Sequence, residues 1–269
     1  MNNKKPTILD LRAKKGKGQL TMLRLFTLEE AAAAEEAGID IVSVPPELVT
    51  HPEYRKVAPS LFSMTGVDHR SAGTRDDYLR FAGKMLNAGA DALYCSGSLA
   101  TVKFLTDEHI PVVGHVGLVP SRNTFTGGFK AVGKTAEAAL IMLEEVRAYE
   151  AAGAFAVEIE VVPVEVASEI SRRVNILLWS MGSGPGCDAQ YLFSEDILGE
   201  NRGHMPRHAK VYRNFAAEYD RLQRHRVAAY SEFIADVASG AYPEEKHIVK
   251  MEEAELAAFR KGLSESQLA

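Results

Sequence analysis

The feature that most constrains the fold is an order that repeats along the chain: a helix-forming segment, a glycine, and then a short apolar segment. The run Glu29–Ala37 is rich in Ala and Glu, and it is followed by Gly38 and the apolar run Ile39–Val44. The same order returns at residues 74–95 and 135–162. Because parallel strands need a crossover between them, this alternation predicts parallel β/α units.

Threonines are predicted to begin the helices of these units. Thr27 and Glu30 have the spacing of a capping box, in which each side chain satisfies a backbone N–H of the other residue. Threonine also opens the predicted helices 74–88 and 135–152. Local hydrogen bonds therefore define where these three helices start.

Four further short segments are rich in Val, Ile, Leu or aromatic residues: Leu20–Phe26, Leu61–Met64, Pro111–Gly117 and Asn175–Trp179. Together with the three strands above they make seven predicted strands before residue 180, and an eighth is predicted near Tyr191–Phe193. The length of 269 residues is near the roughly 250 typical of such barrels. We therefore predict a (β/α)8 (TIM) barrel, with an open doubly wound sheet as the rival fold. No linker divides the chain, so we predict a single domain over residues 1–269, in which 206–269 form a helical C-terminal extension with helices over 206–237 and 251–262.

Composition limits the partners. The net charge of −5 and pI near 5.9 give no general attraction to nucleic acid or anionic membranes, and no run of about 18 apolar residues could span a bilayer. Two cysteines cannot form a disulfide framework, and the basic N-terminus lacks the apolar centre of a secretory signal. We predict a cytoplasmic protein that binds a small molecule, with no nucleic-acid or membrane partner.

In a parallel barrel, functional groups gather where the strands end and in the loops beyond. The candidates at these places are chemically reactive or polar side chains: Glu47, His51, Asp68, His69, Arg70, Cys95, Ser96, Ser98, His115, Glu158 and Glu160. Glu158 and Glu160 alternate along one strand, so both point to the same face. Two such carboxylates imply a neighbouring cation, a metal or a raised pKa, or else a structural ion pair.

Arg24 interrupts an otherwise almost apolar strand. It either balances one of the two glutamates or holds a substrate carboxylate through its fork of donors. The run Gly182–Gly186 lacks the lysine of a P-loop and the spacing of a dinucleotide fingerprint, so it is interpreted as a tight turn that brings backbone near a ligand.

Three blocks of the chain, over residues 113–120, 153–163 and 182–190, resemble the ketopantoate hydroxymethyltransferase family of the phosphoenolpyruvate/pyruvate barrel superfamily. Their sequences are VGHVGLVP, GAFAVEIEVVP and GSGPGCDAQ. The resemblance runs over nearly the whole chain. It implies hydroxymethyl transfer from 5,10-methylenetetrahydrofolate to an α-keto acid in pantothenate biosynthesis, with Mg²⁺ on the keto acid and a homo-oligomeric assembly. Glu160 falls on the family's catalytic glutamate and His115 on its strand-five histidine.

The sequence departs from the family where the family holds its metal. Pro46 stands in place of an Asp, the segment Phe62–Gly66 has no Asp, Ser96 replaces a Glu, and Tyr94 replaces the substrate-binding Lys. Mg²⁺ prefers oxygen ligands, commonly carboxylates. We therefore do not expect the family's usual Mg²⁺ site, and we predict no metal ligand.

These observations predict an enzyme similar to 3-methyl-2-oxobutanoate hydroxymethyltransferase, which forms or breaks a bond next to the carbonyl of a small keto acid through an enolate. Glu160 and His115 are the predicted catalytic residues, and the predicted substrate-binding residues are Arg24, Glu47, His69, Tyr94 and Ser96. Two alternatives stay open: a lyase, decarboxylase or hydrolase acting on another small carboxylic acid, and a non-catalytic barrel that binds a ligand.

Overall fold

The computed structural model describes residues 4–66 and 72–266. The chain forms two compact units, residues 1–214 and 215–269. The organisation of the whole chain as one domain stays a prediction. None of the described helices is both long enough and apolar enough to cross a bilayer.

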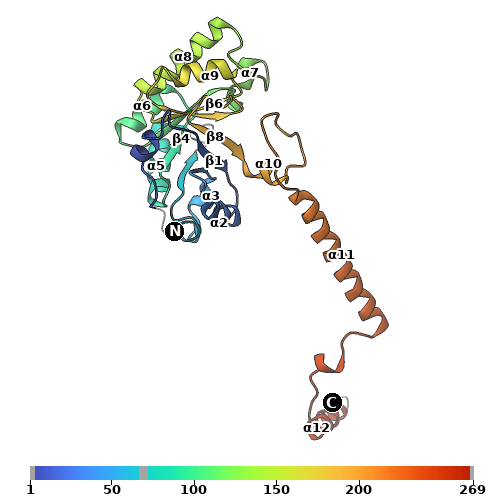
Figure 1. Ribbon diagram of the computed structural model, residues 1–269. Helices are drawn as coiled ribbons and strands as arrows, with labels where there is room; N and C mark the ends of the chain where they lie inside the picture. Colours follow the sequence, from blue (N-terminus) through green and yellow to red (C-terminus); the bar gives the residue numbers. More distant parts are fainter. Residues whose placement is uncertain (1–3, 67–71, 267–269) are drawn as a thin grey trace. The chain divides into compact units, whose positions relative to one another are not determined.

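Eight parallel strands close into a barrel in chain order (Figure 1). They are β1 Leu20–Arg24, β2 Ile41–Ser43, β3 Phe62–Gly66, β4 Ala92–Tyr94, β5 Val112–Gly117, β6 Ala156–Glu160, β7 Leu177–Met181 and β8 Ala189–Phe193. β8 pairs with β1, with Tyr191 opposite Met22, and this pairing closes the sheet. The predicted barrel is confirmed, and the open-sheet rival is wrong.

Helices surround this barrel, and the predicted threonine caps are present (Figure 1). Thr27 and Glu30 form the capping box of α2, while Thr74 and Thr135 cap α5 and α8. The helical segments of the unit are α1 Ile8–Arg12, α2 Leu28–Ala37, α3 Pro46–Val49, α4 Tyr54–Val57, α5 Arg75–Asn87, α6 Leu99–Asp107, η1 Pro120–Arg122, α7 Asn123–Thr126, α8 Ala136–Ala151, α9 Val164–Ser171 and α10 Ser194–Leu198.

The glycine-rich turn joins β7 to β8, and residues 182–188 contain no helix. A Cβ added at Gly186 would lie 1.9 Å from Ser168 Oγ, and one added at Gly184 would lie 2.4 Å from Val164 Cγ2. Both contacts are with α9, so glycine is needed here for close packing of backbone on a helix.

Side chains that alternate along the strands fill the barrel interior. Apolar groups such as Met22, Phe62, Met64 and Trp179 pack against one another with almost no exposure. Burial of each such side chain stabilises the fold by about 1.5–3 kcal/mol. Nearer the carboxyl ends, polar side chains such as Arg24, Ser43, His115 and Glu160 join the apolar ones, and this change of character marks the place of the site.

The second unit contains α11 Phe215–Ser239, η2 Glu245–His247 and α12 Glu253–Ser266. The predicted helix over 206–237 is wrong at its start, because residues 206–214 contain no helix and α11 begins at 215. Tyr212 N–H donates to Ile197 O at 2.8 Å, so this segment bonds to α10 in place of forming a helical turn. The predicted short helix 251–262 is α12, which runs further, to Ser266.

Candidate active site

An open cavity of about 650 Å³ lies at the carboxyl ends of the strands. Each strand of the barrel contributes at least one residue near its end, and the loop after β5 covers one side. The lining residues are Arg24, Phe26, Ser43, Gly66, Tyr94, Ser96, His115, Val119, Pro120, Ser121, Glu158, Glu160, Met181, Tyr191 and Phe193.

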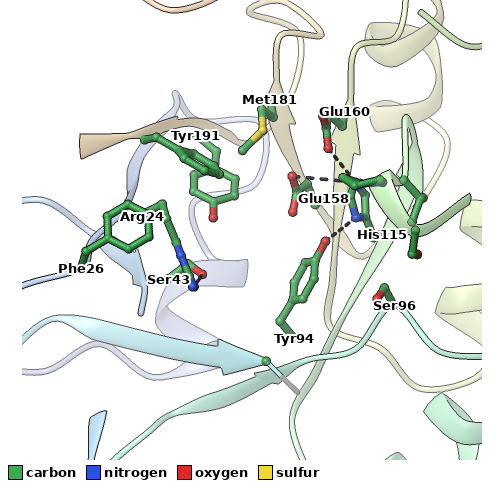
Figure 2. Close-up of a pocket in the computed structure, with 15 residues that line it drawn as sticks. Arg24, Phe26, Ser43, Tyr94, Ser96, His115, Glu158, Glu160, Met181 and Tyr191 are labelled. Atoms are coloured by element: carbon green, nitrogen blue, oxygen red, sulfur yellow. Dashed lines mark hydrogen bonds and ion pairs between the residues drawn. The ribbon is translucent and has the colours of Figure 1, made fainter. Parts of the chain in front are cut away.

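His115 is the centre of a polar cluster on one wall of this cavity (Figure 2). Its Nδ1 is hydrogen-bonded to the Tyr94 hydroxyl. Its Nε2 lies 3.1 Å from Glu160 Oε2 and 3.9 Å from Glu158 Oε1. Neither contact has the geometry of a hydrogen bond. The strand register explains the cluster, because β5 pairs with β6 so that His115 stands opposite Glu158.

The three groups of this cluster are nearly removed from water, with side-chain exposures of 4% for His115, 5% for Glu158 and 13% for Glu160. Burial raises the pKa of Glu158. Burial opposes protonation of His115, but the charges of Glu158 and Glu160 outweigh it and raise the His115 pKa. Both shifts favour the protonated forms of these two neighbouring groups.

Arg24 stands on the opposite side of the cavity from this cluster (Figure 2). Its guanidinium donates to Ser43 Oγ at 2.8 Å and lies 5.4 Å from the centre of the Phe26 ring. These contacts answer the question that the sequence left open: His115 is the partner of the two glutamates, while Arg24 is bonded to a neutral hydroxyl. Its remaining donors face a cavity that can hold an anion.

The structure brings most of the predicted site residues together, because Arg24, Tyr94, Ser96, His115 and Glu160 all line the cavity. Burial raises the pKa of Tyr94 well above its usual range, so this side chain is a neutral phenol that can donate.

Glu47, also predicted, is not among the residues that line the cavity. It is exposed on α3, the short helix that begins at Pro46. His69 lies outside the described residues, as do Asp68 and Arg70.

Several residues line the cavity that were not predicted as site residues. Tyr191 is one of them: it lies on β8 two residues before Phe193, and this spacing puts both side chains on the same face of the strand. Val161, directly after Glu160, has φ 49°, which is a strained conformation for a β-branched residue. Its N–H donates to Met181 O at 2.8 Å, so the main chain beside Glu160 is held by β7. No sequence pattern indicated that strain.

The cavity can be tested against the Mg²⁺ that the resemblance implies. The carboxylates among its lining residues both come from β6, and the ends of β1 and β2 carry Arg24 and Ser43. Atoms of His115, Glu158 and Glu160 do lie within 4.8 Å of one another, close enough to surround an ion. However, Mg²⁺ prefers an octahedron of oxygens, whereas imidazole suits transition metals. The lining residues that the structure describes do not fit the family's Mg²⁺.

The closed barrel, its cavity and the carboxylate–imidazole cluster define an enzyme of the (β/α)8 class that can move protons on a small substrate. A sequence model of the ketopantoate hydroxymethyltransferase family matches residues 63–245, more than half of the chain. The chain therefore belongs to that family, which transfers a one-carbon unit to a keto acid.

Similar proteins cover nearly the whole chain. The 3-methyl-2-oxobutanoate hydroxymethyltransferase of Clostridium botulinum (strain Alaska E43 / Type E3) is 32% identical over 277 residues, covering 94% of this chain and 98% of that protein. The enzyme of the same name from Hyperthermus butylicus is 35% identical over 266 residues, covering 90% of this chain and 89% of that protein. The solved structure of a 2,3-dimethylmalate lyase superimposes with a TM-score of 0.50 and 13% sequence identity. The match covers 97% of this chain and 99% of the lyase chain, and it shows a likeness of fold alone.

Proposed function

We propose that this protein forms or breaks a bond next to the carbonyl of a small keto acid through an enolate, with hydroxymethyl transfer to 3-methyl-2-oxobutanoate as its reaction. The observation that carries the proposal is the position of Glu160, whose carboxylate lines the cavity against His115 Nε2, across from Arg24. The names of the relatives suggest the substrate, and 5,10-methylenetetrahydrofolate is the proposed one-carbon donor.

Each group has a role in this proposal. Arg24, steadied by Ser43, binds the substrate carboxylate through its charged donors. Glu160 removes the proton from the carbon next to the keto group. Ser96 and the Tyr94 hydroxyl, which is hydrogen-bonded to His115 Nδ1, are the cavity groups proposed to face the keto oxygen and stabilise the enolate charge.

We further propose that the family's usual Mg²⁺ site is absent. A bound Mg²⁺ would supply Lewis-acid stabilisation of the enolate. Here the wall at β1 and β2 carries the Arg24 guanidinium, which repels a dication, and the family's metal-side acids are replaced. The neutral Tyr94 phenol stands where the family has a lysine, and it supplies a donor without adding charge.

A barrel that only binds a ligand is a less economical explanation. A site that has lost its chemistry would be expected to fill with Met64, Tyr94 and Pro46. Met64 instead packs in the interior below, and a cavity of about 650 Å³ stays open in front of Glu160. A lyase, decarboxylase or hydrolase would use the same groups, and release of products from the keto acid alone, without the folate, would favour that alternative.

We also propose that the protein acts in the cytoplasm as a homo-oligomer, without nucleic-acid or membrane partners. The described part of α11 has no buried residue, although it carries Phe233 and Ile234. Apolar side chains exposed on a helix favour association with another surface. Light scattering of the full chain would test this proposal, and a monomer at micromolar concentration would contradict it.

The main experiment is an assay of 3-methyl-2-oxobutanoate with 5,10-methylenetetrahydrofolate, with and without Mg²⁺. Deuterium exchange at the carbon next to the keto group is followed in parallel by NMR. Glu160→Gln is expected to lose both turnover and exchange by about 10²–10⁴-fold, while Glu165→Gln, an exposed change on α9, leaves both unchanged. Full activity of Glu160→Gln would contradict the base, and strict dependence on Mg²⁺ would contradict the altered site.

A further inference from the structure

Glu158 is a buried carboxyl group in the cavity to which the proposed reaction gives no task. It lies on β6 two residues before Glu160, so both side chains emerge on the same face. It lines the cavity with a residue exposure of only 4%. A carboxylate in so dry a place is costly unless it is paired or protonated, so its presence needs an explanation.

The surroundings of Glu158 favour its protonated form. Its ion pair with His115, at 3.9 Å, is loose, and it also interacts with the Tyr94 hydroxyl. Burial is the largest effect and raises the pKa of Glu158, and the charge of Glu160 at the same wall acts in the same direction. His115, the Tyr94 hydroxyl and Arg24 act in the opposite direction, but the net shift of the Glu158 pKa is upward.

His115 connects the two glutamates. Because Tyr94 occupies Nδ1, the other ring nitrogen is the one that faces both carboxylates, at 3.1 Å from Glu160 and 3.9 Å from Glu158. This Nε2 is buried and has no aligned hydrogen bond. The geometry is that of a proton shuttle between two acids on one strand.

We propose that Glu158 is the acid of the reaction, donating a proton to the one-carbon carrier while Glu160 acts as the base. This inference rests on the proposed function. The C–H bond next to the keto group breaks, its proton passes to Glu160, and its electron pair forms the enolate. The enolate forms a C–C bond to the methylene carbon, one C–N bond of the folate breaks, and the departing nitrogen takes the proton of Glu158.

His115 then closes the cycle. Nε2 gives a proton to Glu158 and takes up the proton that Glu160 removed. One C–H bond and one C–N bond are lost, one C–C bond and one N–H bond are gained, and both carboxyl groups regain their starting states. Water replaces the second folate nitrogen in a later step, which gives the hydroxymethyl group and a second N–H bond.

The test separates proton removal from bond formation. Exchange of the substrate C–H in D₂O, without folate, requires the base but not the acid. Glu158→Gln is therefore expected to keep exchange within about threefold of wild type while turnover with 5,10-methylenetetrahydrofolate falls by about 10²–10⁴-fold. Glu158→Asp, which keeps an acid of shorter reach, is expected to recover part of the turnover. Glu160→Gln loses both activities, and Glu165→Gln serves as the matched control.

Several results would overturn the inference. Turnover of Glu158→Gln within about threefold of wild type would show that no acid is needed there. An equal fall of exchange and turnover in both Glu158 variants would assign Glu158 a merely structural role. Wild-type protein that shows neither exchange nor turnover would overturn the proposed function itself, and exchange without turnover would overturn the choice of carrier together with the proton transfer to its nitrogen.

Discussion

Gly117, the last residue of β5, offers a sharp test of how the barrel positions Glu160. Its φ is +86°, and a Cβ added there would lie 2.3 Å from the backbone oxygen of Glu160 and 2.9 Å from Val162 Cγ2. The same oxygen accepts a hydrogen bond from Leu118 N–H at 2.9 Å. Because the nearest atom belongs to the main chain, Gly117→Ala cannot be accommodated by a side-chain rotation and must move the backbone that carries the proposed base.

The cost has two parts. A left-handed conformation costs a residue with a Cβ about 1–2 kcal/mol, and overpacking in a dense interior costs about 1–3 kcal/mol more. We expect a total loss of about 2–5 kcal/mol in the free energy of unfolding. Gly38 provides the matched control, because it has φ +78° and nothing within 4 Å of an added Cβ. Gly38→Ala should show the conformational cost alone.

The assay uses the single tryptophan. Trp179 is fully buried in the barrel interior, so its fluorescence during urea unfolding reports on the barrel. Below the transition, Gly117→Ala should also lose about 10²-fold in turnover, since a displacement of about 1 Å in a catalytic group has effects of that size. If the two alanine variants were equally destabilised, or if Gly117→Ala kept full turnover, the argument that this contact positions Glu160 would be refuted.

Three further predictions concern charge. Arg24→Gln should raise KM for the keto acid by about 10–100-fold, because a charged hydrogen bond contributes about 1.5–3 kcal/mol. Arg24→Lys should recover part of this loss. An unchanged KM would contradict the role of Arg24 in binding the substrate carboxylate. Burial raises the pKa of Cys187 to about 12 and the pKa of Cys95 above its usual value. Iodoacetamide at about pH 8 should therefore label both thiols slowly until urea unfolds the protein. Rapid labelling of the native protein would contradict this burial. The pKa values of Glu158 and His115 are raised above the ordinary 4.5 and 6.5. The stability that these two groups contribute is therefore present at low pH and is lost as the pH rises through the raised pKa values. Urea unfolding at a series of pH values should show this decline in wild type and a flatter profile in Glu158→Gln, and parallel profiles would contradict the raised pKa of Glu158.

Local signals were readable in the sequence because they depend on neighbours a few residues away. Thr27 caps α2 through a hydrogen bond from Glu30 N–H, three residues on, and the spacing of the two residues predicts this bond. Alternation placed Glu158 and Glu160 on one face for the same reason. The start of α11 was predicted wrongly because Tyr212 bonds to Ile197, a distant contact that overrides helical propensity.

The sequence by itself determined the alternating units, their caps and the side chains that face the barrel interior, since these follow from backbone periodicity and short-range hydrogen bonds. Only the tertiary structure decided that β8 closes on β1, that His115 stands beside two glutamates, and that Arg24 bonds to Ser43 on the other side of the cavity. Those contacts join separate strands of the barrel. Their energies depend on register and distance, which become defined once the strands pack together.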